Sequence, residues 1–220
     1  MQFKSFTPIP RLARMAVYTE KIDGTSGLIA VSPTGDTTVE IYAGSRERFL
    51  TKAMVFRQTG DVLRGSELGW VDVSANPSED NYGFGKWVED NAAELVSHLG
   101  PGYHYGEWWG QGIGREYGLK EKRFSLFNTG RWARSKKELE SPPAWATSKW
   151  QLAPPCCHVV PVIDYKEFST KVVDQCLFQL SCEGSHAAPG FMNPEGVVVA
   201  HIDKSKGATM FKKTFNGDKK

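Results

Sequence analysis

Long hydrophobic segments are missing from this 220-residue chain, and their absence excludes the first class of protein to consider. No apolar run approaches the roughly 20 residues that a membrane-spanning helix needs. No secretory hydrophobic region follows the N-terminal residues, and neither internal repeats nor low-complexity segments are present. We therefore expect a folded, soluble protein of the cytoplasm that does not bind a membrane.

Cysteine is scarce, which weighs against two kinds of stabilised fold. The four cysteines are Cys156, Cys157, Cys176 and Cys182, and no two of them form a C-x-x-C pair. The spacing typical of a structural zinc site is therefore absent. We expect free, mostly structural thiols in a reducing compartment.

Net charge is also small, at +2, so the total charge does not identify a polyanionic partner. The distribution is more informative, because residues 61–94 are mostly acidic and residues 115–137 mostly basic. Such asymmetry suits a protein with one face toward phosphates, although a solvated charged face gives the same pattern. With 40% hydrophobic residues, the chain has enough apolar content for one folded domain over residues 1–220.

The apolar patterns predict an α+β fold with antiparallel sheets and flanking helices. Helical spacing of apolar residues indicates one helix over 84–99 and another over 167–181. A turn signal at 32–36 closes a hairpin onto the next strand, whereas 58–81 shows no clear period. Strands are expected at 15–18, 28–31, 37–42, 103–110, 123–128, 158–163, 195–200 and 210–215.

A lysine between two of these strands is the first candidate for chemistry. Lys21 follows an apolar strand and precedes a turn rich in Gly, Thr and Ser, so we expect it near a tight connection within a sheet. In a strand-like register Lys21 and Asp23 point to the same side, and Gly24 lets the backbone approach a ligand closely. The alternative is a solvated hairpin in which neither charged residue has a function.

Other candidates stand at strand ends beside small residues, and together they supply what nucleotidyl transfer to a lysine needs. The lysine must lose a proton and attack an α-phosphate, while positive groups stabilise the phosphoryl charge. Carboxylates must hold metal and ribose, and an aromatic face must hold the base. The candidates are Lys21, Arg46, Glu107, Phe127, Glu195 and Lys212.

Residues 19–25, T-E-K-I-D-G-T, resemble motif I of the covalent nucleotidyltransferases and are most similar to the RNA ligases of phage type. Further segments resemble the family's other motifs, in the family's order. One short motif is weak evidence, but a series over about 190 residues is strong. These segments are 44–46 (motif Ia), 106–110 (motif III), 123–128 (motif IIIa), 194–198 (motif IV) and 211–214 (motif V).

The resemblance implies the ATP-grasp-like nucleotidyltransferase domain of ligases and an ATP-dependent polynucleotide ligase, more closely an RNA ligase. It implies ATP and Mg²⁺ or Mn²⁺ as cofactors. Its substrates are RNA or DNA ends with a 5′-phosphate and a 3′-hydroxyl, and an accessory domain or protein can assist end recognition. A relative of phage ligases is expected in the cytoplasm of a bacterial or phage-infected cell.

The resemblance also implies roles for the residues around the nucleophile. Lys21 would form the lysyl-AMP intermediate. The backbone around Glu20 and Ile22 would contact adenine, and Asp23 and Gly24 belong to the same nucleotide-binding turn.

Roles for the more distant residues follow in the same way. Arg46 would contact ribose or the end of the nucleic acid, with Arg48 as the alternative. Glu107 would bind the ribose hydroxyls. The remaining implied roles are adenine stacking by Phe127, with Phe124 as the alternative; metal binding by Glu195; and α-phosphate binding by Lys212, with Lys213 left open by the lysine doublet.

Two departures from the family's pattern keep other functions open. Asp23 and Ser26 stand where the phage ligases have His and Asn, and Asp is typical of DNA ligases and capping enzymes. Few residues follow motif V, so neither an oligonucleotide-binding barrel nor a helical C-terminal domain is expected. The alternatives are a DNA nick ligase, a capping guanylyltransferase, an adenylylation domain that needs a partner, and a non-catalytic nucleic-acid-binding module.

Overall fold

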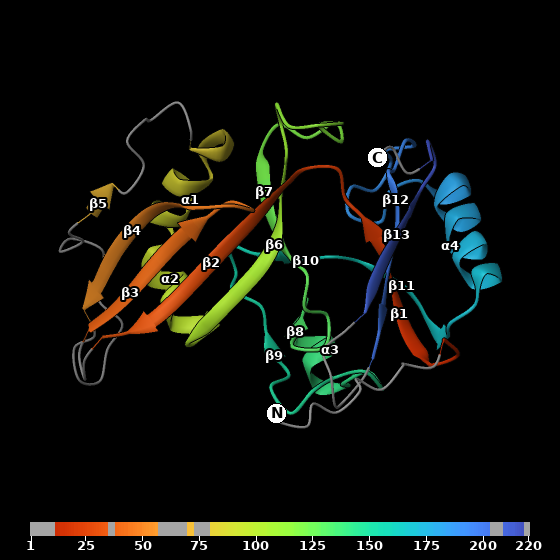
Figure 1. Cartoon of the computed structure of the whole chain (residues 1–220), viewed down its shortest axis with the longest axis horizontal. Helices are drawn as coiled ribbons and strands as arrows, with labels where there is room; N and C mark the ends of the chain where they lie inside the picture. Colours follow the sequence, from red (N-terminus) through yellow and green to blue (C-terminus); the bar gives the residue numbers. More distant parts are fainter. Residues whose placement is uncertain (1–11, 35–37, 57–69, 73–79, 203–208, 218–220) are drawn as a thin grey trace, which may run out of the picture.

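The computed structural model describes residues 12–34, 38–56, 70–72, 80–202 and 209–217. It contains two large β-sheets joined near residue 23 (Figure 1). The order of the larger sheet is β10 (His158–Val159), β7 (Lys122–Leu126), β6 (Gly102–Gly110), β2 (Thr25–Pro33), β3 (Thr38–Gly44), β4 (Phe49–Phe56) and β5 (Trp70–Asp72).

The smaller sheet brings both ends of the described chain together. Its order is β11 (Val162–Glu167), β1 (Met15–Lys21), β12 (Gly196–His201) and β13 (Met210–Thr214), and all its pairs are antiparallel. The two-stranded pair of β8 (Trp132–Ala133) and β9 (Gln151–Leu152) is parallel, as is β10 with β7. The expected α+β class with antiparallel sheets is confirmed.

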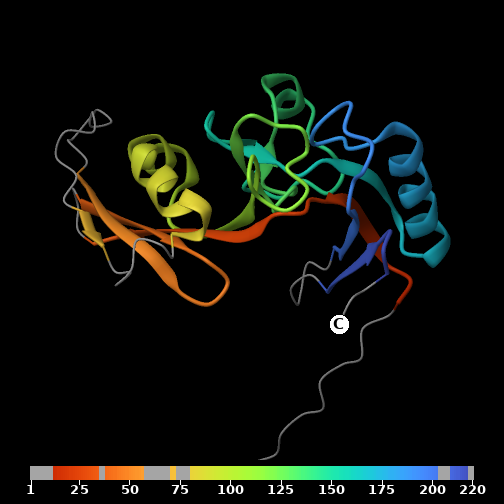
Figure 2. The same ribbon diagram turned by 90° about the horizontal axis from the view of Figure 1, so that it is seen from above.

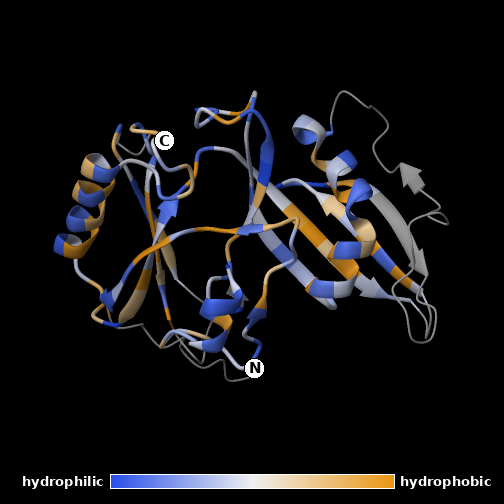
Figure 3. Ribbon diagram, turned by 180° about the vertical axis from the view of Figure 1, so that it is seen from behind, coloured by the Kyte–Doolittle hydropathy of each residue, from blue (hydrophilic) through white to orange (hydrophobic). Residues whose placement is uncertain are grey.

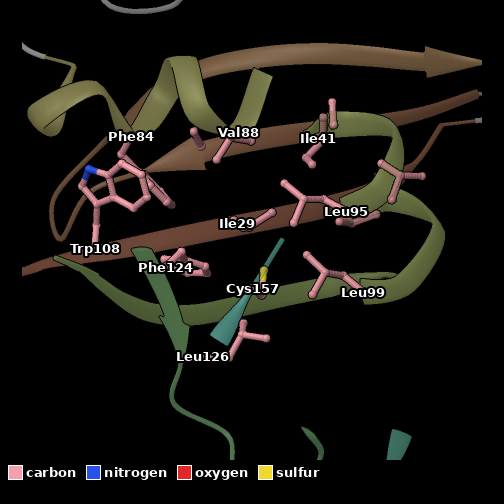
Figure 4. Close-up of a cluster of buried hydrophobic side chains, with 14 of the residues drawn as sticks. Ile29, Ile41, Phe84, Val88, Leu95, Leu99, Trp108, Phe124, Leu126 and Cys157 are labelled. Carbon is pink, nitrogen blue, oxygen red and sulfur yellow. The ribbon is translucent and has the colours of Figure 1, made fainter. Parts of the chain in front are cut away.

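Helices α1 (Phe84–Asp90) and α2 (Ala92–Leu99) cover one face of the seven-stranded sheet (Figure 2). The core between these two helices and the sheet contains Ile29, Ile41, Phe84, Val88, Leu95, Leu99, Trp108, Phe124 and Leu126 (Figure 4). A Cβ on Gly27 would lie within 3 Å of Phe124 and Phe84, so only glycine lets these two rings approach β2. Each fully buried large apolar side chain here stabilises the fold by roughly 1.5–3 kcal/mol.

Helix α4 (Thr170–Glu183) covers one face of the four-stranded sheet and confirms the second expected helix. It begins at the cap Ser169, whose Oγ accepts a hydrogen bond from Val172 N, and ends before Gly184 at φ +81°. The buried residues between α4 and the sheet include Tyr18, Val173, Cys176, Leu180, Val197 and Val199. Hydrophobic and hydrophilic residues alternate along α4 in the hydropathy view (Figure 3).

The helix expected over 84–99 is interrupted at Asn91. The side-chain amide of Asn91 donates to the carbonyl oxygen of Trp87 at 2.8 Å, and its own φ of −110° departs from helical values. An asparagine side chain that competes for backbone partners disfavours a continuous helix. The apolar positions still face the sheet from both pieces. A further short helix, α3 (Lys136–Glu140), lies near β8 and β9.

The expected turn within one sheet after Lys21 is wrong. Strand β1 already pairs with β11 on one side and β12 on the other, so it has no free edge for β2. Strand β2 instead pairs with β3 and β6, which confirms the β2–β3 hairpin. Residues 22–24, here called the crossover, therefore lead directly from one sheet into the other.

Most of the segment without a clear period, 58–81, lies outside the described residues. None of the helices in the described part of the chain has the length and apolar character required to cross a membrane.

Candidate active site

Lys21 and Glu195 form an ion pair at one end of the two central strands of the smaller sheet. Lys21 is the last residue of β1 and pairs in register with Gly196, the first residue of β12, so the preceding Glu195 lies beside it. Lys21 Nζ lies 2.6 Å from Glu195 Oε2, and both side chains are about four-fifths buried. The antiparallel register thus joins two residues that are 174 positions apart.

Glu107 reaches the same place from the larger sheet. It lies on β6 opposite Ser26, and its Oε1 accepts a hydrogen bond from the backbone N of Gly24 at 3.1 Å. Burial raises the pKa of Glu107 to about 7, against the opposing effect of the nearby Lys21 charge. A Cβ on Gly24 would lie 2.5 Å from the carbonyl oxygen of Trp108, so this close approach requires glycine.

Asp23 is held by two residues to which the sequence assigned no individual role. Its backbone N donates to the Tyr117 hydroxyl at 2.7 Å, and its Oδ2 lies 3.3 Å from Arg115 Nε. Arg115 also donates to Asn193 Oδ1 at 2.8 Å, which ties the crossover to the segment just before Glu195. In the sequence, Arg115 is distinguished only as one residue of the basic segment 115–137. The glycines at 110, 112, 114 and 118 were the available sign of a tightly built loop.

Glu20 points to the other face of β1 and has a structural position. Its carboxylate accepts hydrogen bonds from Ser185 Oγ at 2.6 Å and Ala187 N at 2.8 Å. Burial raises its pKa, and these hydrogen bonds act in the opposite direction. Ile22 is buried beside Trp109 and Tyr117. The implied adenine contacts of the Glu20 and Ile22 backbone stay a prediction.

A cavity of about 180 Å³ lies between the larger sheet and the loop that Glu20 anchors. Ser125 pairs with Glu107 in the sheet on one side and with His158 on the other, so the cavity wall continues directly from Glu107. The Oγ of Ser125 also accepts a hydrogen bond from Trp109 Nε1 at 2.9 Å. The lining residues are Trp109, Ser125, Arg134, Cys157, His158, Val159, Pro161, His186 and Ala187.

The two phenylalanines considered for base stacking occupy different environments. Phe124 is fully buried in the core beneath α1, where no ligand can reach its ring. Phe127 is 42% exposed and follows β7, two positions from Ser125, so it lies on the Glu107 face of the sheet. It does not line the cavity of about 180 Å³.

Arg46 and Arg48 are exposed in the turn between β3 and β4. This turn follows Gly44, which pairs with Leu28 near the start of β2. Arg46 therefore lies near the end of the sheet where β2 begins, and its implied contact with ribose or a nucleic-acid end stays a prediction. Within the described residues, no hydrogen bond or ion pair joins Arg46 to Lys21, Glu107 or Glu195.

The register of β13 separates the two lysines of motif V. Lys213 lies opposite Val197, which packs against α4, and its Nζ lies 2.5 Å from Asp174 on that helix. Lys212 is on the opposite face, two positions from Thr214, which pairs with Gly196 and through it with Lys21. Because side chains alternate along a strand, Lys212 shares the face of Lys21.

The site has carboxylates but no preformed metal cluster among the residues that the structure describes. All four cysteines are free thiols, and Cys157 at the cavity wall is buried. The arrangement offers a nucleophilic amine, a carboxylate beside it, a second carboxylate with a raised pKa, and a lysine on the same sheet face.

In sequence, the chain matches neither a family model nor a curated protein. In structure, it is similar to an RNA ligase from Naegleria gruberi, a lysine-to-alanine variant solved with ATP and Mn, with a TM-score of 0.50 and 14% identity. The match covers 93% of this chain and 50% of the ligase chain, so this chain spans half the length of that protein. At this identity, the likeness shows that the chain shares its fold with part of an RNA ligase.

Proposed function

We propose that residues 1–220 form an ATP-grasp-like adenylylation domain that attaches AMP to Lys21 and serves an ATP-dependent polynucleotide ligase, with RNA ends as the first substrate class. The observation that supports this best is the Lys21–Glu195 ion pair of 2.6 Å, with Glu107 reaching the adjacent crossover. The fold shared with part of an RNA ligase supports the same proposal.

The proposed first step uses Lys21 as the nucleophile. Its ammonium gives up a proton, for which Glu195 is the adjacent acceptor, and Nζ then attacks the α-phosphorus of ATP. A phosphorus–nitrogen bond forms as the bond to pyrophosphate breaks. Lys212, on the same sheet face, stabilises the charge that develops on the phosphoryl oxygens.

Glu107 and the cavity of about 180 Å³ are assigned to the nucleoside. The Glu107 carboxylate accepts hydrogen bonds from ribose hydroxyls, and the cavity that continues from it receives adenine. Phe127 lies on the same face but outside this cavity, so the adenine-stacking role implied for it stays a prediction. Carboxylate oxygen suits Mg²⁺ or Mn²⁺, so Glu195 would help to hold the metal, which supplies charge neutralisation for the phosphates.

The two later steps transfer the nucleotide and seal the ends. The oxygen of a 5′-phosphate attacks the lysyl-AMP phosphorus and frees Lys21, and a 3′-hydroxyl then attacks the activated end and releases AMP. Arg46, in the exposed turn between β3 and β4, is assigned to the polynucleotide end. ATP chemistry and the free thiols fit the cytoplasm as the compartment.

Labelling with α-³²P nucleotides tests the first step. With Mg²⁺, wild type should form an adduct with ATP that survives denaturing electrophoresis and alkali but is released by acid, as expected of a phosphorus–nitrogen bond, and Lys21→Ala should form none. Lys166→Ala, which removes an exposed lysine paired with Asp164 on β11, is the matched control and should label normally. Absence of the adduct in wild type would contradict the proposal, and preferential labelling by GTP would indicate a capping enzyme instead.

The match covers half of the ligase chain, so sealing by residues 1–220, alone or with a partner, is tested separately from adduct formation. Sealing assays with 5′-phosphorylated RNA, nicked duplex DNA and pre-adenylylated ends separate these possibilities. Strong adduct formation with weak sealing of every substrate supports the partner-dependent form. Preferential sealing of nicked DNA supports a DNA ligase.

A further inference from the structure

Within the described part of the chain, no helix covers one face of the larger sheet, and this face exposes aromatic rings. His104, Gly106 and Trp108 of β6 point toward the helices, so Tyr103 and Tyr105 point the other way. Figure 2 shows α1 and α2 on one side of this sheet only. We call Phe49, Tyr103, Tyr105 and Phe127 the aromatic face; they are 41%, 65%, 56% and 42% exposed.

The composition of this face is unusual for a sheet that meets only water. An open sheet face normally presents polar residues, whereas contiguous exposed apolar side chains indicate a binding surface. In the described part of the face, every exposed large apolar side chain is aromatic. Aromatic rings on central strands of an open sheet are a common means of stacking unpaired nucleobases.

The two tyrosines present neighbouring exposed rings to flat ligands. Tyr103 and Tyr105 are neighbours on one face of β6, with ring centroids 6.4 Å apart and ring planes inclined by 27°. Both rings are more than half exposed, so a base can stack against either of them.

The aromatic face continues directly from the proposed catalytic residues. Tyr105 is two positions from Glu107 on the same face of β6, and its carbonyl oxygen accepts a hydrogen bond from Phe127 N. On the other side, β2 and the end of β3 lead from Tyr105 to the turn with Arg46 and Arg48, which also contains the exposed Glu47. Rings thus lie between a site for phosphate chemistry and exposed guanidinium groups.

We propose that the aromatic face binds single-stranded polynucleotide, with unpaired bases near the reacting end stacked on Tyr103 and Tyr105. The inference rests on the proposed function for its orientation toward Lys21, but base stacking itself needs no adenylylation. The bases next to the end lie on the tyrosines, and the backbone passes the basic turn. Recognition is by ring faces, so binding tolerates any base sequence.

Fluorescence anisotropy with a dye-labelled, 5′-phosphorylated 12-nucleotide oligouridylate tests the proposal. The double variant Tyr103→Leu/Tyr105→Leu keeps apolar bulk but removes the rings, and its affinity should fall about 5- to 100-fold. The double variant Tyr103→Phe/Tyr105→Phe should bind like wild type. Phe178→Leu, which alters an exposed ring on α4, is the matched control and should leave affinity unchanged.

An abasic oligonucleotide of the same length separates stacking from charge attraction. Wild type should prefer the base-bearing probe, and the double leucine variant should lose that preference while remaining folded by thermal melting. Equal wild-type affinity for both probes would overturn the proposal. So would sedimentation showing a wild-type dimer that the leucine variant cannot form, because the face would then bind a second copy.

Measuring adduct formation with labelled ATP distinguishes failure of the aromatic-face proposal from failure of the proposed function. The double leucine variant should form the Lys21 adduct at the wild-type rate. One outcome is that wild type forms no adduct but binds RNA, and the double leucine variant loses this binding. The proposed function is then wrong, and the aromatic face remains supported. If the adduct forms but the double leucine variant binds RNA like wild type, the aromatic-face proposal is wrong and the proposed function remains supported.

Discussion

The two large sheets use the same construction but present different chemistry. Each sheet buries one face under helices, α1 and α2 in one case and α4 in the other. On its other face, the four-stranded sheet has Lys21 and Lys212, with Glu195 just before the central strand β12. The seven-stranded sheet instead has Glu107 and the aromatic face. In the proposed function, the four-stranded sheet therefore carries out the phosphate chemistry, and the seven-stranded sheet recognises sugar and base.

The difference teaches that the candidate site depends on the junction more than on either sheet. The crossover, residues 22–24, is short and is held from both sides. Glu107 and Tyr117 bind its backbone, and Arg115 joins Asp23 to Asn193 beside Glu195. These contacts fix Lys21 relative to Glu107, although the two residues belong to separate sheets.

The largest effect is expected within the four-stranded sheet, where neighbouring lysines face opposite ways. Lys212→Ala should slow adduct formation by about 10²–10³-fold, the usual cost of losing one group that stabilises transition-state charge. Lys213→Ala should change the rate less than threefold, because it breaks only an exposed pair with Asp174 worth at most about 1 kcal/mol. Initial rates of labelled AMP incorporation measure both.

One result would contradict the assignment of Lys212, rather than Lys213, to the phosphate. If Lys213→Ala is the more damaging change to the rate, the alternation inferred from the β12–β13 register does not decide which lysine reaches the phosphate. Equal thermal unfolding of the two variants is the control, because it excludes loss of the β13 strand as the cause of a slower reaction.

A smaller effect, on stability, is expected at the loop between the sheets. Glu20→Ala removes the acceptor of Ser185 Oγ and Ala187 N, and each buried donor left without a partner costs about 1–3 kcal/mol. Removing the buried carboxylate recovers some desolvation energy, so we expect a net loss of about 2–3 kcal/mol in the free energy of unfolding. Urea denaturation measures it.

Glu20→Gln is the matched control for that measurement and should cost less, because the amide oxygen still accepts one of the two hydrogen bonds. A Glu20→Ala protein as stable as wild type would show that Glu20 does not anchor the loop. The cavity wall at His186 and Ala187 would then need another support.

The sequence predicted elements well where local pattern and burial agree. Helical periodicity located α4 because its apolar stripe coincides with the face buried against the sheet. The prediction of strand-end positions is correct for Lys21 and Glu195 but wrong for Glu107 and Lys212, which lie within β6 and β13. The structure nevertheless brings Lys21, Glu107 and Glu195 close to one another. Alternation also predicts faces within a strand, but only once the register is known.

Long-range pairing was beyond the sequence. Nothing local to 19–31 indicates that β1 is paired on both sides, so the sequence predicts a turn within one sheet where the structure has the crossover. The break at Asn91 arises from a single side-chain hydrogen bond. Arg115 and Tyr117 gain their partners only when the loop of residues 111–121 folds back on the crossover. The role of Lys213 likewise depends on the distant Asp174.

Glu107 provides a pH test of the larger sheet's part in the site. Burial raises its pKa from 4.5 to about 7, so the folded chain keeps a proton that the unfolded chain releases between these values. The free energy of unfolding should therefore fall as pH rises from 4.5 to 7, and Glu107→Gln should remove this contribution. Above pH 7 the side chain is ionised and becomes a stronger acceptor.

The smallest predicted effect follows from that ionisation. ATP binding by wild type should strengthen relative to Glu107→Gln as pH rises through about 7, because a hydrogen bond from a ribose hydroxyl to a charged carboxylate is about 1 kcal/mol stronger than to a neutral amide. This corresponds to about fivefold in Kd at pH 8 and little difference at pH 6, measured by calorimetry. The same comparison with 2′,3′-dideoxy-ATP should show no pH-dependent gap. A gap that persists without the hydroxyls would assign Glu107 to the crossover alone, and the sugar contact would have to come from elsewhere.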